Sequence, residues 1–184
     1  MSYPIRPAIL SDKPALEHLI ARSARELSGG LYTPEQVEGA LKGAFGVDTQ
    51  LIVDGTYFVV EDDGKPIACG GWSKRRTLFG SDARSQRDAS ELDPRVDAAK
   101  IRAFFVDSAY ARRGIGTALL DHCEAAARAQ GYTRFELMAT LPGVPLYTVR
   151  GYVPDPMIHF PLNAANAAAP AISIQFVPMR KSVV

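Results

Sequence analysis

Cysteine, histidine and tryptophan are scarce in this chain of 184 residues, which contains two, three and one of them. Cys69 and Cys123 lie far apart within apolar patterns, so we expect buried thiols and neither a disulfide nor a metal pair. The histidines have no partner at the spacing of metal ligands, and the sequence predicts no metal site. This composition fits a reducing, cytoplasmic compartment.

An excess of one charge and long apolar runs are also lacking. The 21 Lys and Arg residues against 20 Asp and Glu give a formal net charge of +1, too little for the general surface field used in binding polyanions. No apolar run is long enough to span a bilayer, and the first residues lack a continuous apolar signal segment. We therefore expect no nucleic-acid or membrane partner, and a local site for any anionic ligand.

Hydrophobic residues make up 47% of the chain, which is enough to build one full core. The sequence has no internal repeat and no dividing linker, so it predicts a single domain over residues 1–184. A short strand precedes a helix that begins at Ser11 or Asp12, and a second helix begins at Thr33 with capping-box spacing. Two strands joined by Asp63-Gly64 predict an antiparallel hairpin. The polar stretch at about 74–97 predicts a long surface loop.

The second half of the chain predicts a βαβ unit. Residues 100–106 and 134–138 have strand patterns, and residues 114–131 between them have a helical pattern that ends at a glycine. Such a crossover makes the two strands parallel. A short helix over 144–151 and strands near 157–160 and 171–179 follow. The fold class is therefore α/β, with a mixed central sheet of antiparallel N-terminal strands and a parallel βαβ unit, flanked by helices.

The start of the βαβ helix, "ARRGIGTALL", has the character of an anion site. Without side chains at Gly114 and Gly116, ligands can approach the free N–H groups of the first helical turn. The helix dipole and two neighbouring arginines add positive charge, so phosphate is the natural ligand. A plain helix entry with solvated arginines explains this short pattern about equally well.

Two named phosphate motifs fit poorly. A Walker A loop is excluded because no Gly-Lys-Ser/Thr follows the first glycine. A dinucleotide fingerprint remains a distant alternative, since Glu136 has the spacing of a ribose-binding acid. Leu119, however, takes the place of the third glycine, and the unit follows an antiparallel hairpin instead of opening the fold.

The stretch "FFVDSAYARRGIGTALLDHCEAAARAQG" resembles the acetyl-CoA-binding segment of the GNAT superfamily of N-acetyltransferases, with its Q/R-x-x-G-x-G/A loop. The later "LYTVRGY" is similar to the family's Tyr-x-x-x-Gly-Phe segment. The order of predicted elements matches the GNAT acyl-CoA N-acyltransferase fold over essentially the whole chain. The resemblance implies acetyl-CoA as co-substrate.

The resemblance also assigns roles to particular residues. The amides of four consecutive residues, framed by Arg112 and Arg113, would bind the pyrophosphate. These four are Gly114, Ile115, Gly116 and Thr117. The backbones of Phe105 and Val106 would pair with the pantetheine arm where their strand splays from the next one. Ala111 departs from the family's Gln or Arg.

Tyr147 falls where the family places the general acid that protonates the departing thiolate. The strand before the glycine turn offers Lys100 and Arg102 but no carboxylate as general base, so water, Glu61 or Glu136 would serve.

The predicted activity is acetyl transfer to a primary amine of a small molecule or a protein. A CoA-binding sensor or interaction module without turnover is the alternative. Glu91 and Asp93 in the polar loop fit either attraction of a cationic amine or ordinary solvation. The identity of the acceptor stays open, as does a homodimer.

Overall fold

A computed structural model of the chain describes residues 3–84, 88–163 and 171–183, which fold around one mixed β-sheet. The strands lie in the order β1-β2-β3-β4-β5-β8-β6, and β7 also pairs with β8. Within the described residues only β4 and β5 run parallel, and every other neighbouring pair is antiparallel. The predicted fold class, including the parallel βαβ unit, is confirmed.

The elements have the following bounds. The strands are β1 (Ile5–Pro7), β2 (Tyr57–Asp62), β3 (Lys65–Ser73), β4 (Ala99–Val106), β5 (Arg134–Thr140), β6 (Val153–Pro154), β7 (Ile158–Pro161) and β8 (Ser173–Ser182). The α-helices are α1 (Lys13–Glu26), α2 (Pro34–Ala40), α3 (Thr49–Val53), α4 (Ile115–Ala129) and α5 (Val144–Val149), with 3₁₀ turns η1 (Leu10–Asp12), η2 (Ser108–Tyr110) and η3 (Leu141–Gly143).

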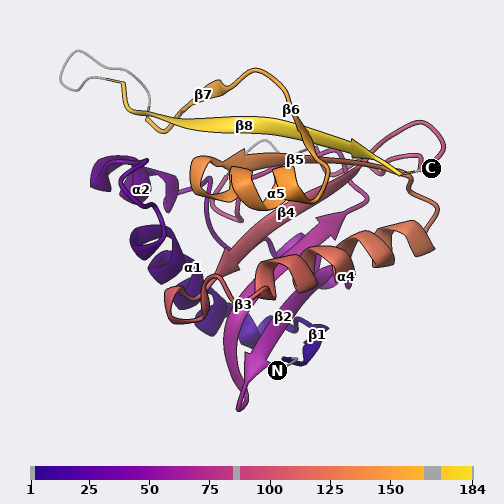
Figure 1. Cartoon of the computed structure of the whole chain (residues 1–184), viewed down its shortest axis with the longest axis horizontal. Coiled ribbons are helices and arrows are strands. Elements are labelled where there is room, and N and C mark those ends of the chain that lie inside the picture. Colours follow the sequence, from indigo (N-terminus) through magenta and orange to yellow (C-terminus); the bar gives the residue numbers. More distant parts are fainter. Residues whose placement is uncertain (1–2, 85–87, 164–170, 184) are drawn as a thin grey trace.

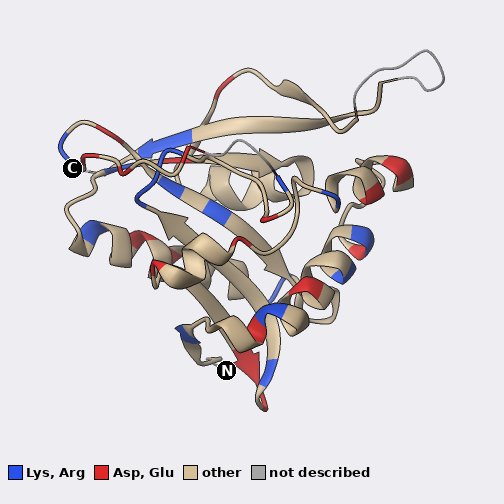
Figure 2. Ribbon diagram, turned by 180° about the vertical axis from the view of Figure 1, so that it is seen from behind, with Lys and Arg blue, Asp and Glu red and all other residues tan. Residues whose placement is uncertain are grey.

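Helices cover both faces of the sheet, and each face has its own buried core (Figure 1). One core packs α4 and α5 against the sheet and includes Leu119, Phe135 and Tyr147. The other packs α1, α2 and α3 against the opposite face and includes Leu16 and Phe176. Lys, Arg, Asp and Glu are interspersed along the surface helices and loops (Figure 2), as a net charge near zero predicts.

Local signals in the sequence explain most element boundaries. Thr33 and Gln36 form the predicted capping box of α2, with reciprocal bonds of 3.3 and 2.9 Å. Asp63 and Gly64 both have positive φ, 48° and 73°, as a type I′ hairpin turn requires. α2 ends at Ala40, and α3 is a short helix that the sequence did not predict.

The polar loop between β3 and β4 is mostly irregular over its described residues, from which 85–87 are excluded. It is nevertheless anchored. Arg75 makes bonds of 2.6 and 2.8 Å to Asp54 at the C-cap of α3, and it forms an isolated antiparallel bridge with Glu91. Ser81 N–H donates to Gly43 O at 2.8 Å, and Asp82 N–H donates to Val47 O at 3.0 Å.

The two cysteines are free and buried, as the sequence predicts. Burial raises the pKa of the Cys69 thiol to about 12, so this side chain packs as a neutral apolar group. No α-helix in the described ranges is both long enough and apolar enough to cross a membrane.

The feature that shapes the site is the separation of β4 from β5. Their parallel pairing consists of Ala99 with Phe135, Lys100 with Glu136 and Ile101 with Leu137. β4 then continues to Val106 without β5 beside it, while β5 stays paired with β8 through Thr140. The predicted splay between these strands is confirmed, and it leaves one edge of β4 unpaired by β5.

A β-bulge accompanies this separation. Gly71 pairs with Arg102, but two residues earlier in β3 Cys69 pairs with Phe105, so β4 has one extra residue. Ala103, in the bulged segment, has a positive φ of 55°, which is unusual for a residue other than glycine. A side chain at Gly70 would lie 2.7 Å from the Phe104 ring. Glycine in this strand therefore permits the close packing of the bulged segment.

Candidate active site

The glycine turn opens α4 in the manner that anion binding needs. Gly114 is the N-cap and has φ 80° and ψ 0°, a left-handed conformation that favours glycine. The first intrahelical bond runs from Ala118 N–H to Gly114 O at 3.0 Å. The amides of Ile115, Gly116 and Thr117 precede that bond, so they are the unpaired donors of the first turn.

The turn lies directly beside the unpaired end of β4. A Cβ added at Gly116 would lie 3.2 Å from Leu146 and 3.9 Å from Val106. Bare backbone at this position therefore faces both α5 and the last residue of β4. Arg112 and Arg113 are exposed next to the turn, Arg112 with φ 64° and Arg113 with its guanidinium 5.2 Å from the Tyr110 ring centre.

A narrow cavity of about 60 Å³ opens where β4 and β5 part. Side chains from the cores on both faces of the sheet line it, so it passes between the strands. The lining residues are Ala44, Phe45, Gly46, Leu78, Phe79, Gly80, Ile101, Arg102, Ala103, Phe104, Phe105, Leu137, Met138, Thr140, Tyr147 and Phe176.

Tyr147 is brought to this cavity by α5. Its side chain is 8% exposed, and its ring packs edge-on against Phe104 and Tyr152 at 6.4 and 5.8 Å between ring centres. Burial raises the pKa of its hydroxyl well above the ordinary value, and Cys123 adds to the effect. The phenol therefore stays protonated at neutral pH and remains a hydrogen-bond donor.

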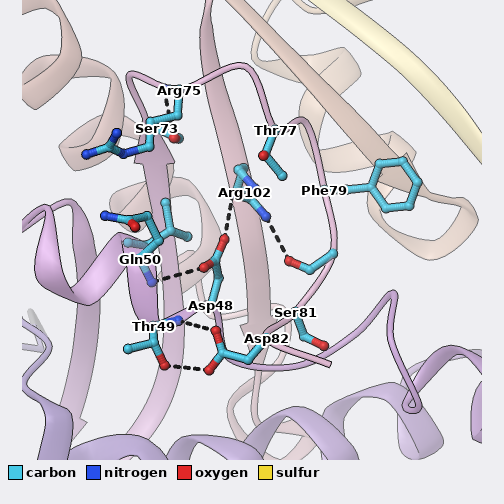
Figure 3. A network of polar contacts seen from close by, with 12 residues as sticks. Asp48, Thr49, Gln50, Ser73, Arg75, Thr77, Phe79, Ser81, Asp82 and Arg102 are labelled. Carbon is cyan, nitrogen blue, oxygen red and sulfur yellow. Dashed lines mark hydrogen bonds and ion pairs between the residues drawn. The ribbon is translucent and has the colours of Figure 1, made fainter. Parts of the chain in front are cut away.

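A buried ion pair fixes the other side of the cavity (Figure 3). Arg102 on β4 pairs with Asp48 at 2.7 Å, and the two side chains are only 3% and 1% exposed. Arg102 also donates to Gly80 O at 2.7 Å, while Asp48 accepts from Gln50 N–H at 3.0 Å and so caps α3. One cation thus joins the bulged strand, a helix start and the polar loop.

Aromatic rings form the rest of that side. We call Phe45, Phe79, Phe105 and Phe176 the aromatic wall, because all four line the cavity and pack on one another. Ring centres lie 5.7 Å apart for Phe45 and Phe105, and 5.5 Å apart for Phe79 and Phe176. Outside the wall, the Arg84 guanidinium lies 4.4 Å from the Phe79 ring centre. Phe79 is half-buried on the polar loop.

The acidic residues named from sequence lie elsewhere. Glu61 binds Arg6 on the neighbouring strand at 2.6 Å, and Glu136 binds Lys100 at 2.7 Å where β4 and β5 are still paired. Glu91 pairs with Lys74 at 3.0 Å, and Asp93 with Arg95 at 2.7 Å. None of these four carboxylates lines the cavity. The described residues also hold no group of three or more His, Cys, Asp or Glu placed to bind a metal.

The sequence profile of the Acetyltransferase (GNAT) family matches residues 24–152, which include β4, the glycine turn, α5 and Tyr147. This match covers well over half of the chain. The chain belongs to the GNAT family. No curated protein sequence matches it significantly.

Solved structures show the same GNAT fold at low sequence identity. A GCN5-related N-acetyltransferase from Rhodopseudomonas palustris aligns with a TM-score of 0.72 and 18% identity, over 100% of this chain and 97% of its own. The PaiA N-acetyltransferase of Thermoplasma acidophilum, solved with coenzyme A, has a TM-score of 0.65 and 14% identity, with 100% of both chains covered. A polyamine N-acetyltransferase of Drosophila melanogaster has a TM-score of 0.62 and 12% identity, over 99% and 100%.

Several residues of this GNAT site escaped the sequence analysis. Arg102 was noted only as a cation on its strand, and Phe105 only for its backbone. Asp48 and the other three members of the aromatic wall were not noted at all. The adjacent glycines Gly70 and Gly71 were the available signal, since glycine inside a strand often marks a bulge or a close approach. The wall had no such signal, because its members come from four separate segments.

Proposed function

We propose that this protein transfers the acetyl group of acetyl-CoA to the primary amine of a small molecule or a protein. The observation that carries the proposal is one continuous path. We infer it from three neighbouring features, which are the first-turn amides of Gly116 and Thr117, the end of β4 at Val106 that β5 leaves unpaired, and the cavity that Tyr147 lines. Such a path suits a ligand with a pyrophosphate, an extended amide arm and a reactive thioester.

Coenzyme A would bind mainly to the backbone. Its pyrophosphate would accept hydrogen bonds from the α4 amides, with Arg112 and Arg113 adding positive charge at the exposed rim. Its pantetheine amides would pair with the backbones of Phe105 and Val106 as an added strand. Ala111 supplies no polar contact, and Arg112 at the next position provides the guanidinium on this rim.

In the chemical step the neutral amine nitrogen attacks the thioester carbonyl and forms the C–N bond, the C–S bond breaks, the nitrogen loses one proton to water and the thiolate receives one. Tyr147 is the proposed source of the proton on sulfur, and water then returns a proton to the phenolate. Because burial raises the pKa of the phenol, complete proton transfer to a thiolate whose thiol has the ordinary pKa of about 8.5 is uphill. The main contribution of Tyr147 is then a hydrogen bond to the sulfur as negative charge develops.

The attacking amine must be neutral, and the cavity favours that state. Its lining side chains are apolar apart from Arg102, Thr140 and Tyr147. Desolvation disfavours an ammonium ion, so a bound amine has a lowered pKa and can lose its proton to water. This mechanism needs no dedicated carboxylate base. Positioning of the two reactants supplies much of the remaining acceleration.

A CoA-binding module without turnover is the second candidate. It is favoured by one observation, which is that the cavity lining among the described residues includes no carboxylate or histidine. Such a protein would bind acetyl-CoA and leave the thioester intact.

Two measurements test the proposal. Acetyl-CoA should raise the melting temperature, by an amount equivalent to about 2.7 kcal/mol at a hundredfold excess over its dissociation constant, and NAD should not. Release of free thiol from acetyl-CoA in the presence of amines should then show turnover. Equal stabilisation by NAD would contradict the CoA site, while stabilisation without thiol release would favour the second candidate.

A further inference from the structure

The walls of the cavity differ from a site built to bind a polycation. Four phenylalanines form the aromatic wall, and Met138 and Leu78 add further apolar surface. Arg102 is the one charged residue in the lining over the described part of the chain. Its partner Asp48 is 1% exposed and does not line the cavity. The charge nearest to a bound acceptor is therefore positive.

We propose that the acceptor is a primary amine on an unbranched apolar or aromatic body that has no second positive charge and no carboxylate. This inference rests on the proposed acetyl transfer and specifies its substrate class. The amine would enter the narrow cavity beside Tyr147, and its apolar body would lie on the aromatic wall.

The shape of the cavity supports an unbranched amine. The opening between β4 and β5, whose lining includes Ile101, Phe104 and Leu137, is narrow, so it favours an unbranched chain over a branch next to the nitrogen. The rings of Phe79 and Phe176 continue the apolar surface beyond this opening. Each additional buried methylene group should improve binding by about fourfold, so longer apolar bodies should bind better.

Electrostatics exclude the two charged classes for different reasons. A second ammonium group would lose its hydration and would find no carboxylate to pair with in the described lining of the cavity. A carboxylate would meet the Arg102 guanidinium. Asp48 already neutralises this group at 2.7 Å, and the group already donates to Gly80 O. For either class, interactions in the cavity therefore do not offset the hydration free energy that the charged group loses on leaving water.

A matched pair of amines tests the inference. Hexylamine and cadaverine have similar length and differ in having a methyl or an amino group at the far end. We expect kcat/KM for hexylamine to exceed that for cadaverine by about tenfold or more, and phenylethylamine to exceed phenylalanine similarly. Calorimetric binding of each amine to the protein saturated with CoA should give the same order. Equal or reversed preference in either pair would overturn the inference.

Variants of Phe79 isolate the role of charge. Phe79→Glu places a carboxylate on the wall, and Phe79→Gln makes nearly the same change in shape without charge. The Glu variant should shift the ratio of cadaverine to hexylamine upward by about tenfold relative to the Gln variant. An identical ratio in the two variants would contradict a charge-based exclusion.

The design separates two failures. A protein that binds CoA but turns over no amine contradicts the proposed acetyl transfer, and its binding order for the amines still decides the substrate class. A protein that acetylates cadaverine as well as hexylamine retains the proposed function and loses this inference.

Discussion

The two parts of the proposed site are built by different means. On the proposed coenzyme side, a few nearly consecutive residues around Gly114 and Gly116 expose backbone amides at a helix start. On the proposed acceptor side, side chains from the segment before α3, the polar loop, β4 and β8 meet in the cavity, and the buried pair of Arg102 and Asp48 holds them. The first side depends on backbone conformation, and the second depends on tertiary packing.

This difference has consequences for how each side tolerates change. Backbone donors survive most substitutions of neighbouring side chains but fail when a side chain occupies their space. A wall of side chains changes its ligand with each substitution, provided that the framework beneath it holds. We therefore expect a substitution on the coenzyme side either to abolish coenzyme binding or to leave it nearly unchanged. Substitutions on the acceptor side should change acceptor binding gradually.

The largest effect should come from Gly116→Glu. The new side chain would meet Leu146, for which even a Cβ lies at 3.2 Å, and its charge would repel a pyrophosphate. Stabilisation by acetyl-CoA in a thermal shift assay should disappear. Ala118→Glu, which adds the same charge at an exposed position of α4, should retain it. Wild-type affinity in Gly116→Glu, with a native circular dichroism spectrum, would refute a backbone site.

Asp48→Asn should have the next largest effect, on stability. It keeps an acceptor for Gln50 N–H but leaves the Arg102 charge buried without its counter-ion. We expect a loss of about 3 kcal/mol in the free energy of unfolding, measured with urea. Glu38→Gln breaks the exposed pair with Arg25 in the same way and should cost much less stability, because solvent screens that pair. Equal losses would mean that the buried pair does not hold the acceptor side.

Tyr147→Phe should lower turnover by about 10²-fold, at the low end of the range for a positioned acid, and should leave stability and CoA affinity nearly unchanged. Tyr152→Phe is the control, because its buried hydroxyl donates to Glu124 at 3.0 Å and does not line the cavity. That variant should lose about 1–2 kcal/mol of stability and keep its turnover. Full activity in Tyr147→Phe at saturating amine would remove Tyr147 from the mechanism.

The smallest effect concerns the anchor of the polar loop. The hydrogen bond from Arg75 lowers the pKa of Asp54, outweighing the opposing effect of burial. Its stabilisation is therefore present above the ordinary Asp pKa of about 3.9 and is lost as pH falls through the lower folded value. Asp54→Asn should cost about 1 kcal/mol near pH 7, and the difference from wild type should shrink in acid. A difference that does not change with pH would exclude the ionised pair as its source.

The same contrast explains what the sequence could predict. The hairpin, the βαβ unit and the glycine turn are encoded by residues close in sequence, such as Asp63-Gly64 and Gly114 to Thr117. The splay between the strands and the role of Tyr147 were predicted only from the family resemblance. The end of α2 at Ala40 and the helix α3 depend on contacts with distant segments, as does the aromatic wall. The hydrophobic periodicity within one segment carries no information about contacts with distant segments.

The bulge at Ala103 has a further consequence, because it resets the alternation of β4. Before it, Ile101 belongs to the core beneath α4 and Arg102 reaches toward α3; after it, Phe104 packs with the α4 core and Phe105 with the opposite core. An unbroken strand would send Phe104 and Phe105 to the opposite sides. The extra residue thus exchanges the faces of the sheet on which the following side chains of β4 lie. Insertions or deletions of one residue here would exchange the two surfaces, which makes strand length, as much as residue type, a determinant of this site.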